Sequence, residues 1–371
     1  MRRLYWRPAG ASWRSLALLA LLSLVGLTLV LGAPRRTRKD RYEAKLAAAE
    51  HAAKSFRALA EERVRRGHPI DERRDPTRSG LIGEKSTPLT TSAGSLVSKQ
   101  TSANPNFAAV VVELLGRLGL ERGDVVAVGC SGSFPALNVA VLAAVETLGL
   151  EPLVITSNAS SDWGANLPDF TWLDMERVLV ERKLARSRSL AASLGGIEDR
   201  ALELDAEGRQ LLTASIARNG VALLPQTSFE DAVRRRLELY ESAANGRRIG
   251  AYVNVGGGSV SVGRKRGKLA FRAGINRPGV TAVRVDSVIA RFLERGVPVV
   301  HLVRVQELAS EHGLPTPPTA SVELGQGPVF EESEPNRLFA AVVFVILVGA
   351  VVFVGRRARS RAHLREAPEL P

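Results

Sequence analysis

The chain has 371 residues, of which 45% are hydrophobic, so it is long and apolar enough for one large or two modest domains and is not wholly disordered. Its formal charge of +13 is concentrated near the two ends and in the run 35–41, which leaves only about +2 for 42–337 and argues against a nucleic-acid-binding domain. A single cysteine, Cys130, excludes an intrachain disulfide and a multi-cysteine metal site.

The first element is an uncharged stretch, 15–33, that follows the basic tail 1–14. Its length is close to the roughly 20 residues that a helix needs to cross a bilayer. A cleaved signal peptide is the competing interpretation, but Leu31 stands where cleavage after Ala33 would require a small residue. We therefore expect an uncleaved transmembrane helix, with a buried core helix as the remaining alternative.

A basic run opens the next segment, 34–67, and strong helix formers with apolar residues at helical spacing follow it. This pattern predicts a stalk or partner-facing helix above the membrane, and a helix packed on its own domain stays open as an alternative. The residues 68–104 are rich in Gly, Pro, Ser and Thr and have no periodicity, which is typical of a linker or of a loop that lies partly over the domain.

Helical and strand patterns alternate through 105–329. The expected strands are 124–129, 151–157, 248–258 and 297–305, and a hairpin turn is expected at 263–268. The expected helices are 104–120, 134–150, 172–185, 205–219, 228–243 and 286–295. Strands separated by helices of this length predict an α/β domain with a mainly parallel, Rossmann-like sheet covered by helices on both faces.

An acidic segment, 330–337, precedes the second uncharged stretch, 338–354, and an arginine-rich tail, 355–371, closes the chain. The second stretch is short for a transmembrane helix but sufficient with its charged flanks. Because both tails are basic, both termini are expected in the cytoplasm and the domain between the helices outside it. The basic run at 35–41 is evidence against this topology, although long loops are translocated largely regardless of charge.

The first candidate site is the turn between strand 124–129 and the next helix. It consists of Gly129, Ser131, Gly132 and Ser133 around Cys130. Backbone N–H groups at a helix start, flanked by serine hydroxyls, suit a phosphate or carboxylate, and a plain connecting turn is the alternative. The turn lacks the Gly-Lys-Ser/Thr end of a phosphate-binding loop, and Ser133 occupies the last glycine of a nucleophile elbow.

Two further loops follow strands at the same expected edge of the sheet. The loop 157–170 offers Ser161, Asp162, Trp163 and Asn166, together with Ser160 and Asp169. The stretch 253–263 offers Asn254, Gly256, Gly257, Gly258 and Ser259. It resembles the phosphate hairpin of the sugar-kinase and actin superfamily, but Asn254 replaces the usual aspartate and no second such hairpin is found.

Catalysis by a serine would need a base. His301 and His312 are the two histidines in the domain, so the candidate catalytic residues are Ser131, Asp162 and His301, although His301 also fits a buried structural role. No zinc-ligand spacing is present, and neither a metal nor a cofactor is expected. A basic cluster at the predicted hairpin tip, Arg264, Lys265, Arg266 and Lys268, is a candidate for binding a polyanion.

Four stretches, 87–115, 125–179, 252–263 ("YVNVGGGSVSVG") and 288–302, together resemble the poly-gamma-glutamate system protein family. The resemblance implies a bacterial plasma-membrane protein that accompanies the synthesis and export of poly-gamma-glutamate. It implies the synthase complex subunits, and the polymer itself, as partners, but it assigns no catalytic residue.

Two functional hypotheses follow from the residues and the resemblance. The first is a non-catalytic accessory protein whose domain binds glutamate carboxylates or partner subunits. The second is a hydrolase or transferase that acts on the polymer or its precursor through Ser131 or Ser133. A nucleotide-binding regulator is a third, and it would require the domain to lie in the cytoplasm.

Overall fold

The computed structural model describes residues 11–279 and 285–365, without the side chains of Lys265 and 361–365. The chain forms two compact units. One is the segment Lys39–Phe330, and the other contains the two ends of the chain, up to Arg38 and from Glu331 onward. The two units are described separately below.

The larger unit is built on a seven-stranded sheet. In spatial order its strands are β11 (Gly274–Asn276), β12 (Val299–Leu302), β10 (Ile249–Val255), β3 (Val125–Ser131), β4 (Glu151–Ser157), β8 (Ser189–Ser193) and β9 (Ala222–Leu223). All neighbouring pairs are parallel except β11 with β12. The prediction of an α/β domain with a mainly parallel sheet is therefore confirmed.

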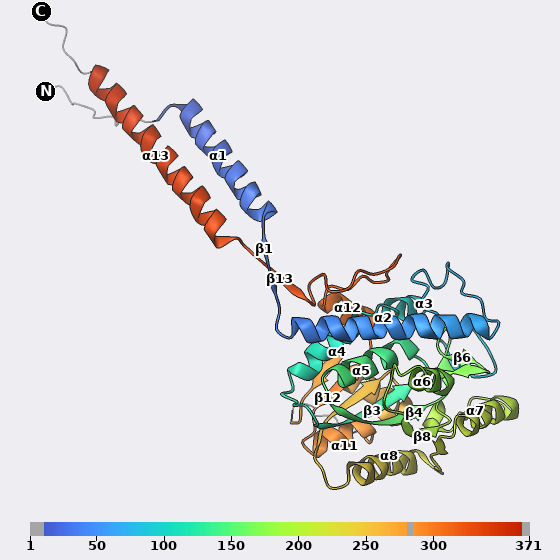
Figure 1. Ribbon diagram of the computed structural model, residues 1–371. Helices are drawn as coiled ribbons and strands as arrows, with labels where there is room; N and C mark the ends of the chain where they lie inside the picture. Colours follow the sequence, from blue (N-terminus) through green and yellow to red (C-terminus); the bar gives the residue numbers. More distant parts are fainter. Residues whose placement is uncertain (1–10, 280–284, 366–371) are drawn as a thin grey trace, which may run out of the picture. The chain divides into compact units, whose positions relative to one another are not determined.

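Helices cover both faces of this sheet (Figure 1). The longer ones are α2 (Tyr42–Arg65), α4 (Phe107–Gly116), α5 (Pro135–Thr147), α6 (Trp172–Glu181), α7 (Ala206–Arg218) and α8 (Phe229–Ala244). The shorter ones are α3 (Leu96–Ser102), η1 (Ile197–Asp199), α9 (Ser259–Val262), α10 (Arg264–Ala270), α11 (Val288–Glu294) and α12 (Val305–Glu311). Small two-stranded sheets join β2 (Thr90–Ser92) to β5 (Ser160–Ser161) and β6 (Asn166–Leu167) to β7 (Phe170–Thr171).

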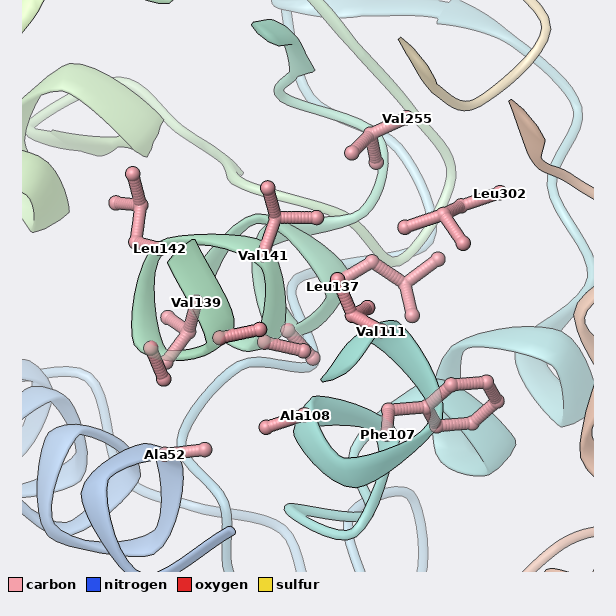
Figure 2. Packing of buried hydrophobic residues seen from close by; sticks show 14 of the residues in the cluster. Ala52, Phe107, Ala108, Val111, Leu137, Val139, Val141, Leu142, Val255 and Leu302 are labelled. Atoms are coloured by element: carbon pink, nitrogen blue, oxygen red, sulfur yellow. The ribbon is translucent and has the colours of Figure 1, made fainter. Parts of the chain in front are cut away.

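Alternation along β3 divides the core into two layers. Val126 and Val128 face α4 and α5 in one hydrophobic cluster, whereas Val125 and Ala127 belong to the cluster under α8 and α11. Figure 2 shows part of the first layer, in which small residues of α2, α4 and α5 meet. In the second layer the rings of Tyr252 and Phe292 stack with centroids 4.7 Å apart.

The structure does not support a stalk between residues 34 and 67. Helix α2 lies along α4 and α5 (Figure 1), and Ala52 and Leu59 are fully buried against them. The alternative interpretation, a helix packed on its own domain, is therefore the one observed. Its alanines allow the backbones of the three helices to approach closely, which a stalk in water would not require.

The segment 68–104 is not a linker. It contains β2 and α3, and Leu81, Leu89 and Thr101 are buried. Several of its Ser and Thr side chains form hydrogen bonds within the segment or to the rest of the unit, as Thr87 does to Asn166 O, which is why a low-periodicity sequence can still be ordered. The predicted hairpin at 263–268 is also wrong, because these residues form α10 after a turn of positive φ at Gly263.

The unit formed by the chain ends contains α1 (Trp13–Gly32) and α13 (Arg337–Arg365). Two helical stretches, Trp13–Gly32 and Arg337–Ser360, are long and apolar enough to cross a membrane. The helices pack closely at Gly26, where a Cβ atom would lie 2.7 Å from Val343 Cγ1. Beside them, β1 (Arg35–Arg38) pairs antiparallel with β13 (Glu331–Glu334), so the basic run is matched by the acidic one.

Candidate functional site

The sheet order reverses between β3 and β10. The chain leaves β3 toward α5 on one face and leaves β10 toward α9 and α11 on the other. The two strand ends are neighbours, because a Cβ atom on Gly256 would lie 3.6 Å from Ser131 Cβ. In open parallel sheets, ligands bind at such a reversal, beyond the carboxyl ends of the strands. We therefore take this edge as the candidate site.

The glycine-serine turn after β3 is closed largely by its own groups. Asn138 on α5 holds both backbone groups of Ser131, and Ser133 N donates to Ser131 Oγ over 3.2 Å. Gly132 passes so near the next loop that a Cβ atom there would lie 2.6 Å from Asn158 O. Gly129 has a packing role within β3, since a Cβ atom would lie 2.4 Å from the Tyr252 hydroxyl.

A lysine that the sequence analysis missed lies next to this turn. Lys99 on α3 is 2% exposed, and its Nζ donates to Ser133 O and lies 2.9 Å from Ser161 Oγ. The Phe134 ring lies 3.8 Å from the same Nζ. Burial lowers the pKa of Lys99 to about 7, although the carboxylate of Asp162 acts in the opposite direction.

The loop after β4 contributes two kinds of residue. Ser161 and Asp162 face Lys99, and Ser161 N donates to Ser133 Oγ over 3.0 Å. Asn166 is structural, because its side chain bonds both backbone groups of Glu84. Three other candidates from this loop also have partners: Trp163 lies under Arg74, Ser160 Oγ donates to Ser161 O, and Asp169 pairs with His68.

Asn158, directly after β4, is the least satisfied buried polar residue at this edge. Its side chain is fully buried, and neither its Oδ1 nor its Nδ2 has a hydrogen-bond partner among the described residues. Buried polar atoms normally have partners, so an orphaned amide indicates a water or ligand position. No property of the sequence distinguishes Asn158 from the other turn-forming asparagines.

The predicted grouping of Ser131, Asp162 and His301 is not assembled: no hydrogen bond joins these three residues among those the structure describes. His301 Nδ1 lies 3.1 Å from Asn254 Nδ2, and Asn254 Oδ1 accepts from the Tyr252 hydroxyl. Burial lowers the pKa of His301 to about 4, so it is neutral in a core network. Asn254 is likewise fully buried and serves this network.

The stretch after β10 is only partly available to a ligand. Ser259 Oγ accepts from Glu198 N and donates to Gly196 O, which ties it to the loop after β8. A Cβ atom on Gly257 would have no neighbour within 4 Å, and a Cβ atom on Gly258 would have only Ser261 Oγ, 3.9 Å away. Gly258 is also exposed. These two glycines therefore form the accessible rim.

A buried ion pair that was not predicted from the sequence stabilises the same edge of the sheet. Arg236 of α8 pairs with Asp199 over 2.6 Å and donates to Ser157 and Ser193 at the ends of β4 and β8. Every member of this cluster has a partner, so it fixes the strand ends and the loop 194–199 rather than awaiting a ligand.

The basic cluster does not lie at a hairpin tip. Arg264 pairs with Glu198 over 2.9 Å and lies over the Phe229 ring. Arg266 and Lys268 are exposed on α10, and the side chain of Lys265 lies outside the described residues. Of the predicted four cations, the structure therefore describes three, and one of these, Arg264, is already paired with an acidic side chain.

Other chemistry is less well supported. No group of three or more potential metal ligands occurs within 11–279 and 285–365, and burial raises the pKa of the Cys130 thiol well above its usual range.

A groove of about 540 Å³ between α8 and α11 is lined by charged side chains such as Glu238 and Arg291. Its residues belong to the helical layer, so it is separate from the strand-end site.

No protein-family model matches the chain, and a search of curated proteins finds no match. Among solved structures, an archaeal alanine:glyoxylate aminotransferase is similar to it at 11% sequence identity and a TM-score of 0.19. That similarity covers 94% of this chain and 70% of the aminotransferase chain. A TM-score this low does not indicate a shared fold or a shared function.

Proposed function

We propose that the chain is a membrane-anchored component of poly-gamma-glutamate synthesis or export. Its α/β unit would bind anionic ligands, the polymer first among them, or partner subunits of the synthase complex. The observation that carries the proposal is Lys99, a buried amine that forms no salt bridge within the described part of the chain. The pathway itself rests on the family resemblance of the sequence.

The chemistry of the polymer fits this edge of the sheet. A chain linked through γ-carboxyl groups leaves one α-carboxylate free on each unit, and a carboxylate is the partner that a buried ammonium lacks. Protonated Lys99 would donate to the carboxylate. Binding an anion would raise the pKa of Lys99, so binding should take up protons near neutral pH.

The fold is proposed to be Rossmann-like. Support comes from the strand order, in which β3 starts near the middle of the sheet and β4, β8 and β9 extend to one side of it. The strands β10 and β12 then extend to the other side. This is the connectivity that creates a ligand crevice at the reversal.

We place the protein in a bacterial plasma membrane, with α1 and α13 as transmembrane helices, both termini in the cytoplasm and the α/β unit outside. Two apolar helices and the arginine-rich tails support this topology. Reporter fusions at residues 36 and 330 test it. Activity of an extracytoplasmic reporter at both positions is expected, and cytoplasmic signals at both would contradict it and favour a nucleotide-binding role.

The ligand proposal is tested with the full chain in detergent. Isothermal titration with poly-gamma-glutamate oligomers should show saturable binding, and Lys99→Met should weaken it at least tenfold because the buried cation is lost. Lys54→Met, at an exposed position on α2, is the matched control and should bind normally. Equal affinities of the two variants, or no binding by the wild type, would contradict the proposal.

The second candidate function is enzymatic, and one observation favours it. Ser131 and Ser133 accept hydrogen bonds from backbone N–H groups, and neither hydroxyl contacts a basic side chain within the described residues. Ser161, in contrast, has its Oγ 2.9 Å from Lys99 Nζ. If the site is catalytic, Ser161 is therefore a better nucleophile than the two serines expected from the sequence.

A further inference from the structure

We propose that Ser161 and Lys99 form a serine-lysine dyad that transfers acyl groups, with Ser161 Oγ as the nucleophile and Lys99 Nζ as the general base. The substrate class is an amide of a γ-glutamyl group. Only this substrate assignment rests on the proposed function, because the dyad itself is argued from geometry.

The geometry is that of an activated nucleophile. The distance of 2.9 Å between Ser161 Oγ and Lys99 Nζ allows direct proton transfer. Ser133 O accepts a second hydrogen bond from Nζ, and the Phe134 ring packs against it, so the amine is held in one place. Serine-lysine pairs replace serine-histidine pairs in some hydrolases, where the lysine must be neutral to act as a base.

The environment favours the neutral amine. Lys99 has no carboxylate in salt-bridge contact among the described residues, and the surrounding chain buries its side chain. Its lowered pKa, about 7, leaves a substantial fraction unprotonated at neutral pH. A general base is most effective when its pKa lies near the working pH.

The dyad lies close to the protein surface. Ser161 is 8% exposed, and the neighbouring residues Ser92 and Ala93 are exposed. The chain passes over the hydroxyl at Gly94, where a Cβ atom would lie 3.1 Å from Ser161 Oγ. Only glycine allows so close an approach, and a bulkier residue would occupy the space next to the nucleophile.

The proposed reaction has two balanced steps. Ser161 Oγ bonds to the γ-carbonyl carbon as its proton moves to Lys99 Nζ, and Lys99 then gives that proton to the leaving nitrogen as the C–N bond breaks. The product is an acyl ester on Ser161. Water or an amine then attacks the ester, its proton passes to Lys99, and Lys99 returns a proton to Ser161 Oγ as the acyl group leaves.

The test uses the full chain in detergent and a fluorophosphonate probe, which labels activated serines without any need for the polymer. Mass spectrometry should place the label on Ser161, and the labelling rate should rise with pH through an apparent pKa near 7. Ser161→Ala and Lys99→Met should each label at least 100-fold more slowly. Ser242→Ala and Lys54→Met, at exposed helical positions, are the controls and should label normally.

The second readout is release of p-nitroaniline from γ-glutamyl-p-nitroanilide, which should disappear in Ser161→Ala. Labelling of a different serine, or no labelling of folded wild-type protein, would overturn the dyad. The two proposals can fail separately. Polymer binding retained without labelling would refute only the dyad, whereas labelling of Ser161 without polymer binding would refute only the proposed function.

Discussion

Replacement of Leu59 by alanine tests whether α2 belongs to the folded core. Leu59 is fully buried where α2 meets the α4 and α5 layer. Removing three carbon atoms forfeits about 2–2.5 kcal/mol of transfer free energy, and the cavity left behind brings the expected loss of unfolding free energy to about 2–5 kcal/mol. In a unit of this size, that corresponds to a decrease of roughly 4–10 °C in the melting temperature.

Thermal unfolding of the full chain in detergent, followed by near-ultraviolet circular dichroism, measures this loss. Val64 lies on the same helix but is 54% exposed, so Val64→Ala should change the unfolding free energy by about 0.5 kcal/mol or less. A stalk helix would make the two substitutions equivalent. Equal melting temperatures for Leu59→Ala and Val64→Ala would therefore refute the packing described here.

Two further predictions concern buried charged and titratable groups. Arg236→Met leaves its carboxylate partner buried and unpaired, so it should cost about 3–5 kcal/mol in urea unfolding, whereas Arg235→Met, on the surface of the same helix, should cost about 1 kcal/mol or less. Arg236→Lys should not restore the lost unfolding free energy. Equal stability of Arg236→Met and Arg235→Met would contradict the buried ion pair. The pKa of His301 is about 4 in the folded state and higher in the unfolded state, so the unfolded chain binds the extra proton and stability falls as the pH drops from about 6.5 to 4. In His301→Gln, the slope of unfolding free energy against pH between about pH 4 and 6.5 should be smaller by about 1 kcal/mol per pH unit. The same slope in the variant and the wild type would contradict the lowered pKa of His301.

The regular parts of the α/β unit were predictable from the sequence. Strand β4 (Glu151–Ser157) occupies the expected residues, because a run of β-forming residues between two helices has few alternatives. Strand β8 (Ser189–Ser193) was missed, since its alanines and serines have little strand propensity and only pairing with β4 makes it a strand. Such segments become strands only through pairing with strands that are distant in the sequence, and the amino-acid composition does not indicate that pairing.

The candidate site was also predictable only where it depends on local sequence. The contact between the turn after β3 and the loop after β4 was predictable, because loops at the carboxyl ends of parallel strands converge. Lys99 was missed because the segment around it has the composition of a linker, and only tertiary contacts with β5 make it a buried amine. The serine N-cap at Ser95 was the available signal for α3, and it could have indicated an ordered helix there.

The charged runs beside the two apolar segments have separate interpretations when only the sequence is considered. From the sequence alone, the basic run 35–41 is evidence about topology, and the acidic segment 330–337 is a juxtamembrane linker. In the structure they form one antiparallel ribbon, with Arg36 3.8 Å from Glu331. The two runs therefore belong to one structural element, and neither run by itself indicates this pairing.

Hydrogen-deuterium exchange of the full chain, with and without poly-gamma-glutamate oligomers, tests most directly where the ligand binds. The account predicts protection confined to the strand-end loops 92–99, 129–134, 157–163 and 256–259. Protection of α10 alone, or of the groove between α8 and α11, with unchanged exchange in those four loops, would contradict it.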